Sequence, residues 1–273
     1  MAGKVTVPEV RSRKRAAGAP PVVMLTAYDT PGARIADTAG VDVILVGDSV
    51  ANNVLGYEHT FQVDTAVMVH HVAAVGRAGP RALVVGDMPW LSYHVSTEDT
   101  VRNAAALVRV GAEAVKLEGG RARVPMIEAL VGAEIPVMGH LGLTPQSVHA
   151  MGGYKVQAKQ AAAADALLDD AKAITAAGVF AIVLEGMPDV VAARVTAEVD
   201  VPTIGIGAGA ACDGQVLVFH DLLGLGTGTA PKFVRRYADL HDVAVEAVAA
   251  WAADVRAGGF PAEAETYHLP GPA

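Results

Sequence analysis

The sequence has little cysteine and no long apolar run. Its one cysteine, Cys212, excludes an intrachain disulfide, and a chain without disulfides is typical of a reducing, cytoplasmic location. No uncharged apolar run reaches the roughly 18 residues that a membrane helix needs. The first residues are not a long apolar segment either. We therefore expect neither a membrane partner nor a secretory signal.

Basic residues are also in the minority. The chain has 21 Lys and Arg against 29 Asp and Glu, which gives a net charge of −8. Binding to nucleic acid needs a clustered basic face. The one basic cluster, which consists of Arg11, Arg13, Lys14 and Arg15, instead predicts a solvated helix face. We therefore expect no nucleic-acid partner.

What the sequence does have is apolar residues, which make up 52% of its 273 positions. A single α/β barrel commonly reaches this length. The apolar fraction is ample for one large core, and it is compatible with a subunit interface in a homo-oligomer.

The stretch VDVILVGDS, residues 41–49, has the pattern of a strand buried on both faces that ends in a carboxylate. For one strand alone, Asp48 would be interpreted as a turn or helix cap. The same layout recurs, however, and parallel α/β folds build their sites at such strand ends. Ionisable side chains end five apolar strands: Asp48, Asp87, Lys116 with Glu118, His140 and Glu185.

Strand and helix patterns alternate about eight times along the chain, with short connections and no linker. This alternation predicts a parallel sheet with right-handed crossovers. Eight units favour a closed (β/α)8 TIM barrel, and we expect residues 1–273 to form one such domain, with a short N-terminal lead-in and a polar C-terminal tail. The alternative is a doubly wound sheet, but GIGAG, residues 205–209, lacks the dinucleotide-binding glycine pattern.

In such a barrel Asp48, Asp87 and Glu118 would share a small volume at the mouth. Three carboxylates repel one another unless they are protonated or joined by a cation. All three side chains would offer only oxygen ligands to such a cation, so the sequence predicts Mg²⁺ rather than Zn²⁺. In the structural alternative, one carboxylate pairs with Lys116 and no metal binds.

Four further residues are candidates for contact with a substrate. Lys116 alternates with Glu118 and points into the barrel, where it could hold an anion or form a Schiff base. Glu185, at a glycine-rich strand end, suits a general base, or else it pairs with a buried cation. His140 could face a ligand or belong to the core. Ser49 could donate a hydrogen bond to a ligand or cap the following turn.

Motifs along nearly the whole chain resemble those of the ketopantoate hydroxymethyltransferase family. The resemblance extends from about Val5 to His268, and AVKLEGG together with GHLGLTPQS is more specific than any single glycine pattern. The motifs are LTAYD, VGDS, DMP, AVKLEGG, PVMGHLGLTPQS, GGYKVQ, TIGIGAG, CDGQVLV and FPAEAETYH.

The resemblance implies a (β/α)8 barrel of the phosphoenolpyruvate mutase type that assembles as a homodecamer. It implies an enzyme that transfers a hydroxymethyl group from 5,10-methylenetetrahydrofolate to 3-methyl-2-oxobutanoate. The product, 2-dehydropantoate, belongs to pantothenate and coenzyme A biosynthesis. A reduced folate and a small α-keto acid are thus the expected ligands.

The resemblance also implies roles for individual residues. Asp48 and Asp87 match the magnesium ligands, and Glu118 matches the carboxylate beside them. Glu185 matches the proton acceptor that would form an enolate stabilised by Mg²⁺. Asp48, Ser49, Asp87, Lys116 and His140 match groups that contact the substrate or product.

Two other functions compete with this interpretation. The first is a carbon–carbon lyase of the same barrel class acting on an α-keto acid, which commonly places a reactive cysteine in a lid. Cys212 is not in such a motif. The second is a catalytically silent barrel, which would have no need for three clustered carboxylates.

Overall fold

A computed structural model describes residues 3–14, 18–226, 228 and 230–269. The internal contacts divide the chain into two units, Met1–Phe219 and His220–Ala273. Each unit is described by itself, and the single-domain organisation expected for residues 1–273 stays a prediction.

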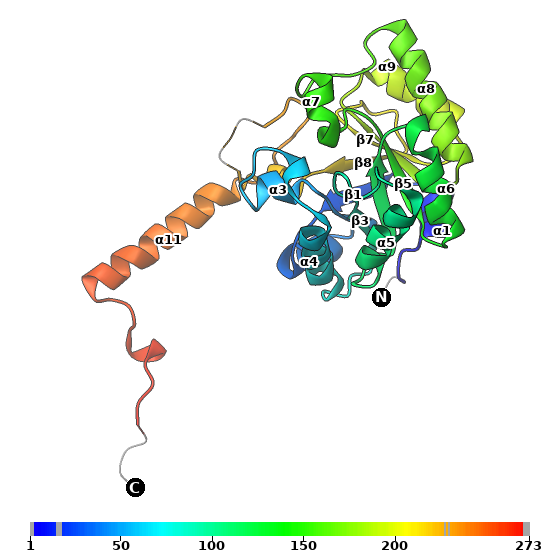
Figure 1. The fold of residues 1–273 in the computed structure, drawn as a ribbon. Helices are drawn as coiled ribbons and strands as arrows, with labels where there is room; N and C mark the ends of the chain where they lie inside the picture. Colours follow the sequence, from blue (N-terminus) through cyan, green and yellow to red (C-terminus); the bar gives the residue numbers. More distant parts are fainter. Residues whose placement is uncertain (1–2, 15–17, 227, 229, 270–273) are drawn as a thin grey trace. The chain divides into compact units, whose positions relative to one another are not determined.

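The first unit contains a closed barrel of eight parallel strands, which confirms the predicted fold class (Figure 1). Each strand pairs with the next along the chain, and β8 pairs with β1. The strands are β1 (Val22–Thr26), β2 (Val43–Val46), β3 (Leu83–Asp87), β4 (Ala114–Glu118), β5 (Val137–Gly142), β6 (Ala181–Glu185), β7 (Thr203–Ile206) and β8 (Gly214–Leu217).

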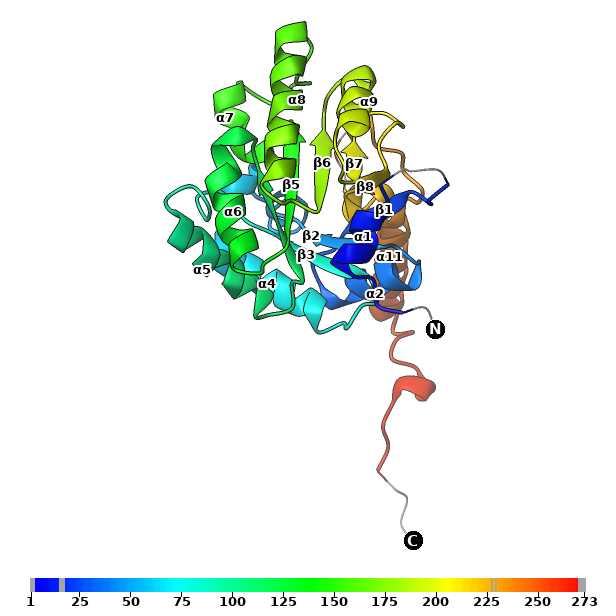
Figure 2. The ribbon, with the colours of Figure 1, turned by 90° about the vertical axis from the view of Figure 1, so that its right-hand side faces the viewer.

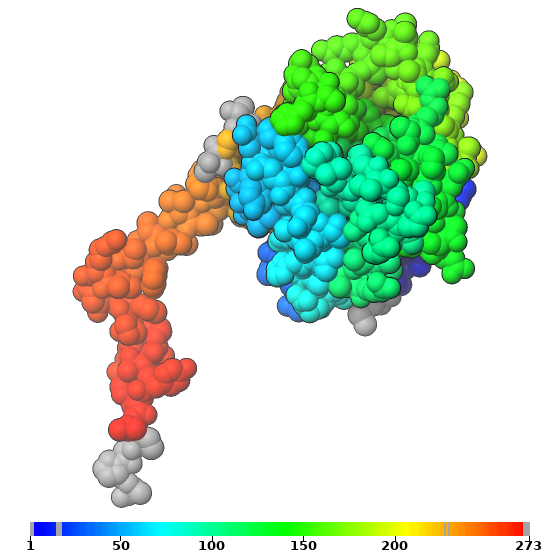
Figure 3. All heavy atoms as spheres, viewed as in Figure 1, coloured from blue at the N-terminus to red at the C-terminus, as the bar shows by residue number. Residues whose placement is uncertain are grey.

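Helices surround the barrel because each crossover must bury one apolar face against the sheet. Neighbouring helices contact one another, α4 with α5, α5 with α6, and α8 with α9, and on the face drawn in Figure 3 their atoms lie against one another. Figure 2 shows α6, α8 and α9 outside the strands. The helices of this unit are α2 (Thr30–Thr38), α3 (Val50–Asn53), α4 (Thr65–Gly76), α5 (Thr97–Val108), α6 (Val124–Gly132), α7 (Val148–Met151), α8 (Ala161–Ala176) and α9 (Asp189–Glu198), with 3-10 turns η1 (Thr60–Gln62), η2 (Arg121–Arg123) and η3 (Pro145–Ser147). Its last residue begins α10 (Phe219–Leu223).

Aliphatic side chains fill the barrel interior. Val43, Val85 and Met138 are fully buried in one cluster that includes residues from all eight strands. The burial of such side chains is the main stabilising contribution, about 1.5–3 kcal/mol for each large one. This layer of the core lies below the carboxyl ends of the strands, so the mouth is left to polar residues.

Side chains cap the N-termini of α4 and α5. The Asp64 side chain accepts a hydrogen bond from the N–H of Val67 at the start of α4. Ser96 does the same for Asp99 at the start of α5. Each cap satisfies an N–H that the helix itself cannot.

The basic cluster near the N-terminus is a solvated helix face only in part: Arg11 is exposed on a helix as predicted, whereas Arg13 and Lys14 form ion pairs. Lys14 forms an ion pair with the fully buried Asp213 at 3.0 Å, and Arg13 pairs with Asp42 at 3.1 Å. These contacts tie the segment after α1 (Val7–Ser12) to the amino ends of the strands. Arg15 lies outside the described residues.

The second unit contains α11 (Leu240–Ala257) and the turn η4 (Glu263–Glu265). The amphipathic pattern of the sequence predicts a helix from about Val234 to Arg256, but the helix begins at Leu240. None of its residues is buried, and Val248, Trp251 and Val255 are exposed. In the described part of the chain, no helix is both long and apolar enough to cross a bilayer.

The last strand is also shorter than predicted. The pattern QVLVFHD predicts an eighth strand over residues 215–221, but β8 ends at Leu217 and the residues from Phe219 form α10. The backbone N–H of Phe219 donates to Oγ1 of Thr26, which turns the chain out of the barrel directly after the strand.

Candidate active site

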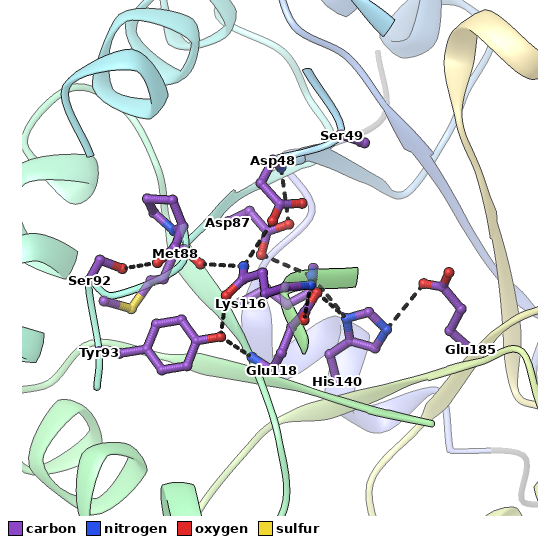
Figure 4. Close-up of polar contacts among 12 residues, drawn as sticks. Asp48, Ser49, Asp87, Met88, Ser92, Tyr93, Lys116, Glu118, His140 and Glu185 are labelled. Carbon is purple, nitrogen blue, oxygen red and sulfur yellow. Dashed lines mark hydrogen bonds and ion pairs between the residues drawn. The ribbon is translucent and has the colours of Figure 1, made fainter. Parts of the chain in front are cut away.

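The predicted site residues meet at the carboxyl ends of the strands because neighbouring strands pair in register. Asp87 on β3 lies beside Lys116 on β4, and Glu118 on β4 lies beside His140 on β5. Val183 on β6 lies beside His140, and Glu185 follows two residues later on the same side of the strand. Figure 4 shows these side chains pointing toward one another.

Two aspartates and a lysine form the centre of the cluster. Asp48, Asp87 and Lys116 are 4%, 2% and 3% exposed. Nζ of Lys116 lies 2.9 Å from Oδ1 of Asp87, and the backbone N–H of Asp48 donates to Oδ2 of Asp87 at 3.2 Å. The backbone of one aspartate thus holds the side chain of the other.

An imidazole connects this centre to Glu185. Nδ1 of His140 lies 3.3 Å from both Oε1 of Glu118 and Nζ of Lys116. Nε2 lies 3.2 Å from Oε2 of Glu185. The side chain of Glu185 is 17% exposed, whereas those of Glu118 and His140 are 3% and 4% exposed. Glu185 is therefore the carboxylate best placed to meet a ligand entering from the mouth.

Burial and neighbouring charges shift the protonation of these groups. Burial, with the charges of Asp87 and Glu118, raises the pKa of Asp48 well above its usual value. Burial raises the pKa of Asp87 too, although Lys116 opposes the shift. Burial lowers the pKa of Lys116, but the three carboxylates outweigh it and raise that pKa overall, so the ammonium stays charged.

The pKa of His140 is raised to about 9. Burial and the charge of Lys116 both favour the neutral ring, but the contacts with Glu118 and Glu185 outweigh them. The imidazolium is therefore the favoured form at neutral pH, and its Nδ1 and Nε2 lie within ion-pair distance of Glu118 and Glu185.

The raised pKa of Asp48 makes a prediction for stability. A carboxyl group whose pKa is higher in the folded state stabilises the fold below its unfolded pKa, and this contribution is lost as pH rises through the folded pKa. At neutral pH, therefore, the ionised carboxylate opposes folding. We expect Asp48→Asn to raise the thermal unfolding midpoint of the protein in chelator, and to raise it less at mildly acidic pH. A lower midpoint at neutral pH would contradict this expectation.

Sequence reasoning missed two residues that hold the cluster together. Nε2 of Gln146 donates to Oδ2 of Asp48 at 2.8 Å, and its backbone N–H donates to Oε2 of Glu118 at 3.1 Å. The hydroxyl of Tyr93 donates to Oε1 of Gln146 at 2.6 Å. Gln146 stood in a motif after a predicted strand, which was its only signal, and Tyr93, in the loop after β3, had none.

Ser49 lies at the edge of the cluster, whereas Asp29, after the end of β1, lies outside it. Oγ of Ser49 lies 2.8 Å from the hydroxyl of Tyr28, which accepts a hydrogen bond from Thr26 at 3.0 Å. Ser49 is therefore held at the rim of the site next to Asp48. Asp29, the carboxylate that follows β1, is exposed and caps α2 by accepting from the N–H of Gly32 at 2.7 Å.

The chemistry of the central pair suits a hard divalent cation. Asp48 and Asp87 offer buried carboxylate oxygens that repel each other. Lys116 pairs with Asp87, as the structural alternative predicts, and offsets part of this repulsion. Magnesium usually takes one or two protein carboxylates and keeps positions for water and substrate. Throughout the described residues, no group of three or more His, Cys, Asp or Glu side chains is placed to hold a metal. Glu118 as a third ligand stays a prediction.

A close contact between two strands fixes where Glu185 lies. Gly142 at the end of β5 has a φ of 98°, and a Cβ there would overlap the carbonyl oxygen of Glu185. The same carbonyl accepts the N–H of Leu143 at 2.8 Å. Glycine therefore allows the end of β6 to approach β5 closely enough for Glu185 to reach His140.

Comparison with known proteins gives a consistent result. A family model described as ketopantoate hydroxymethyltransferase matches residues 4–263. A protein of Bradyrhizobium diazoefficiens named 3-methyl-2-oxobutanoate hydroxymethyltransferase 2 is 56% identical over 267 residues, 98% of this chain and 90% of that protein. The 3-methyl-2-oxobutanoate hydroxymethyltransferase of Methylobacterium sp. (strain 4-46) is 58% identical over 249 residues, 91% of this chain and 86% of its own length.

Solved structures with the same fold are more distant in sequence. The phosphoenolpyruvate phosphomutase of Streptomyces platensis subsp. rosaceus superposes with a TM-score of 0.59 at 16% identity, covering 93% of this chain and 88% of its own. A 2,3-dimethylmalate lyase, a member of the PEP mutase/isocitrate lyase superfamily, gives 0.58 at 16%, covering 96% and 91%. These two similarities confirm the barrel type, and the reaction has to be inferred from the residues of the site.

Proposed function

Because the chain belongs to the ketopantoate hydroxymethyltransferase family, we propose that its buried polar cluster is the active site for hydroxymethyl transfer to 3-methyl-2-oxobutanoate. The enzyme is a hydroxymethyltransferase of pantothenate biosynthesis. The observation that carries the assignment of the site is the order of groups across the mouth. A dicarboxylate centre with its lysine is separated from a more open carboxylate, Glu185, by the imidazole of His140.

The substrate is an anion, and the cluster offers it positive charge. Lys116 stays cationic because three carboxylates surround it, and His140 is cationic at neutral pH. Their charges offset the carboxylate of the keto acid. Ser49, held by Tyr28 at the rim, is placed to donate a hydrogen bond to the same group.

Asp48 and Asp87 would hold Mg²⁺, with Glu118 next to them. When bound there, the cation supplies Lewis-acid polarisation of the keto group. Glu118 keeps the imidazole of His140 in place and receives the backbone N–H of Gln146. A loss of Mn²⁺ binding in Asp48→Ala but not in Glu118→Gln would limit the direct ligands to the two aspartates.

Glu185 would remove the proton from carbon 3 of the substrate. The electron pair of that C–H bond becomes the enolate, and the proton moves to the carboxylate. His140 contacts Oε2 of Glu185 at 3.2 Å, which leaves Oε1 to face the substrate. The nucleophilic carbon then forms a C–C bond with the one-carbon unit of 5,10-methylenetetrahydrofolate, which we propose as the second substrate. Both C–N bonds of that unit break and water supplies the hydroxyl group. The proton taken up by Glu185 and one from the water go to the two folate nitrogens, and tetrahydrofolate leaves.

The direct test of this function is an assay with both substrates. We expect 2-dehydropantoate to form from 3-methyl-2-oxobutanoate only when 5,10-methylenetetrahydrofolate is present, and chelator to stop the reaction. Product formation without the folate would exclude it as the donor. Cleavage of a related α-keto or 2-hydroxy acid without transfer would instead indicate the lyase alternative.

The enzyme is also proposed to be a homodecamer in the cytoplasm, the location resting on its single cysteine. The exposed apolar side chains of α11, among them Val248, Trp251 and Val255, support a subunit interface. We expect sedimentation to give the mass of ten chains, and Trp251→Glu to lower that mass. An exposed polar substitution on the same helix, Glu246→Gln, is the control. A monomeric wild type at assay concentration would contradict this proposal.

A further inference from the structure

We propose that Gln146 is a positioning residue that holds the Asp48 and Glu118 carboxylates in the arrangement needed to bind the divalent cation, with Tyr93 fixing the orientation of its amide. The inference rests on the proposed Mg²⁺ site, and it concerns residues that touch neither the substrate nor the cation in that proposal.

Gln146 lies on η3, after β5, and is 6% exposed. Its Nε2 donates to Oδ2 of Asp48 at 2.8 Å and to the carbonyl oxygen of Met88 at 3.0 Å. Its backbone N–H donates to Oε2 of Glu118 at 3.1 Å. One residue therefore bonds to groups at the ends of β2, β3 and β4, and both carboxylates are held by the same short turn.

The hydrogen bonds allow only one orientation of the amide. A carbonyl oxygen can only accept, so the amide atom facing Met88 must be the NH₂ group. The hydroxyl of Tyr93 accepts the backbone N–H of Glu118 at 3.2 Å, so its own proton goes to Oε1 of Gln146 at 2.6 Å. Two independent contacts thus direct an N–H of Gln146 at Asp48.

The Gln146 amide determines which oxygen of the Asp48 carboxylate accepts a hydrogen bond from the protein and which stays available to a cation. Oδ2 receives the amide proton, so the carboxylate cannot rotate freely and its other oxygen is directed away from Gln146. A methionine has nearly the same length but no donor, and a glutamate would present an acceptor. Figure 4 shows Tyr93 and Met88 on the opposite side of Glu118 from Glu185, so the network should act on cation binding rather than on the base.

The test is the affinity of the full-length protein for Mn²⁺, measured by electron paramagnetic resonance at one fixed pH. We expect Gln146→Met to weaken binding by about 10–100-fold, as is typical for residues that orient metal ligands. Tyr93→Phe keeps the ring and removes both hydrogen bonds of the hydroxyl, of which the one to Oε1 of Gln146 orients the amide. We therefore expect a measurable loss of affinity that is smaller than in Gln146→Met, about tenfold or less. The double variant should bind about as weakly as Gln146→Met alone, because Tyr93 acts through the amide.

Activity gives a second readout that a purely structural role would not move. We expect saturating Mg²⁺ to restore most of the kcat of Gln146→Met. The control is Thr203→Val, which removes a buried hydroxyl that bonds to Thr196 at 2.7 Å at the amino end of β7. It should lower the unfolding midpoint and leave Mn²⁺ affinity unchanged.

The outcomes are distinct. If the wild type binds Mn²⁺ and both Gln146→Met and Tyr93→Phe bind it equally well, Gln146 does not position the ligands and the inference is wrong. If the wild type itself binds no Mn²⁺, the proposed cation site is wrong and the inference fails with it. If Gln146→Met does not fold, Tyr93→Phe still decides, because wild-type affinity in that variant would contradict the inference.

Discussion

Glu185→Gln is expected to lose exchange of the carbon-3 hydrogen of 3-methyl-2-oxobutanoate with solvent. Glutamine keeps the size and one acceptor of the side chain, but it does not take up a proton. A general base typically contributes about 10²–10⁴ in rate, so the loss should be at least this large. The measurement uses substrate deuterated at carbon 3, with Mg²⁺ and without folate, because formation of the enolate does not need the one-carbon donor.

Binding of the keto acid separates this role from a structural one. Calorimetry should show similar affinity for the variant and the wild type, since Lys116 and the aspartates remain. Exchange at the wild-type rate would exclude Glu185 as the base. Loss of binding would instead mean that Glu185 acts as a partner of the His140 cation, from which it lies 3.2 Å away.

Asp87→Ala is expected to abolish both Mn²⁺ binding and turnover, and also to destabilise the fold. The aspartate is a proposed cation ligand and the ion-pair partner of Lys116, at 2.9 Å. Removing one member of a buried pair typically costs about 3–5 kcal/mol, because the other charge is left unpaired. Asp48→Ala should abolish turnover without that cost, since Asp48 is bonded to Gln146 through an amide rather than a charge. Denaturant unfolding of both variants in chelator measures the difference.

A second substitution separates the two effects of Asp87→Ala. In Asp87→Ala/Lys116→Met, no ammonium is left unpaired beside the missing aspartate, and we expect much of the lost stability to return while activity stays absent. Normal metal binding and turnover in Asp87→Ala or Asp48→Ala would show that the cation site has been assigned to the wrong residues. Equal stability of Asp87→Ala and the wild type would mean that the ion pair adds nothing to the fold.

The sequence was sufficient for the barrel and for the charged residues of the site. Each candidate stood at the end of an apolar run, and parallel pairing then placed Asp87 beside Lys116 and Glu118 beside His140. These positions follow from strand register, which is a local property of the chain.

Gln146 could not be found in the same way, because its partners lie far away in the sequence. Its bond to Asp48 joins residues 98 positions apart, and it forms only when the turn after β5 lies over the ends of β2, β3 and β4. Tyr93 likewise comes from a loop with no repeating pattern. The ends of elements were also less well predicted, as at β8, because there the hydrogen bond between Phe219 and Thr26 ends the strand.

The approach of β5 to β6 at Gly142 has a consequence for how this enzyme can evolve. Gly142 carries no side chain and takes part in no chemical step, yet any larger residue would push the carbonyl of Glu185 outward. In a random-mutagenesis survey selected for growth without pantothenate, we expect this position to tolerate as few substitutions as Asp87. At this position selection would preserve the spacing of two strands rather than a reactive group. Redesign of the loop after β5 for a new substrate would therefore have to begin beyond Gly142.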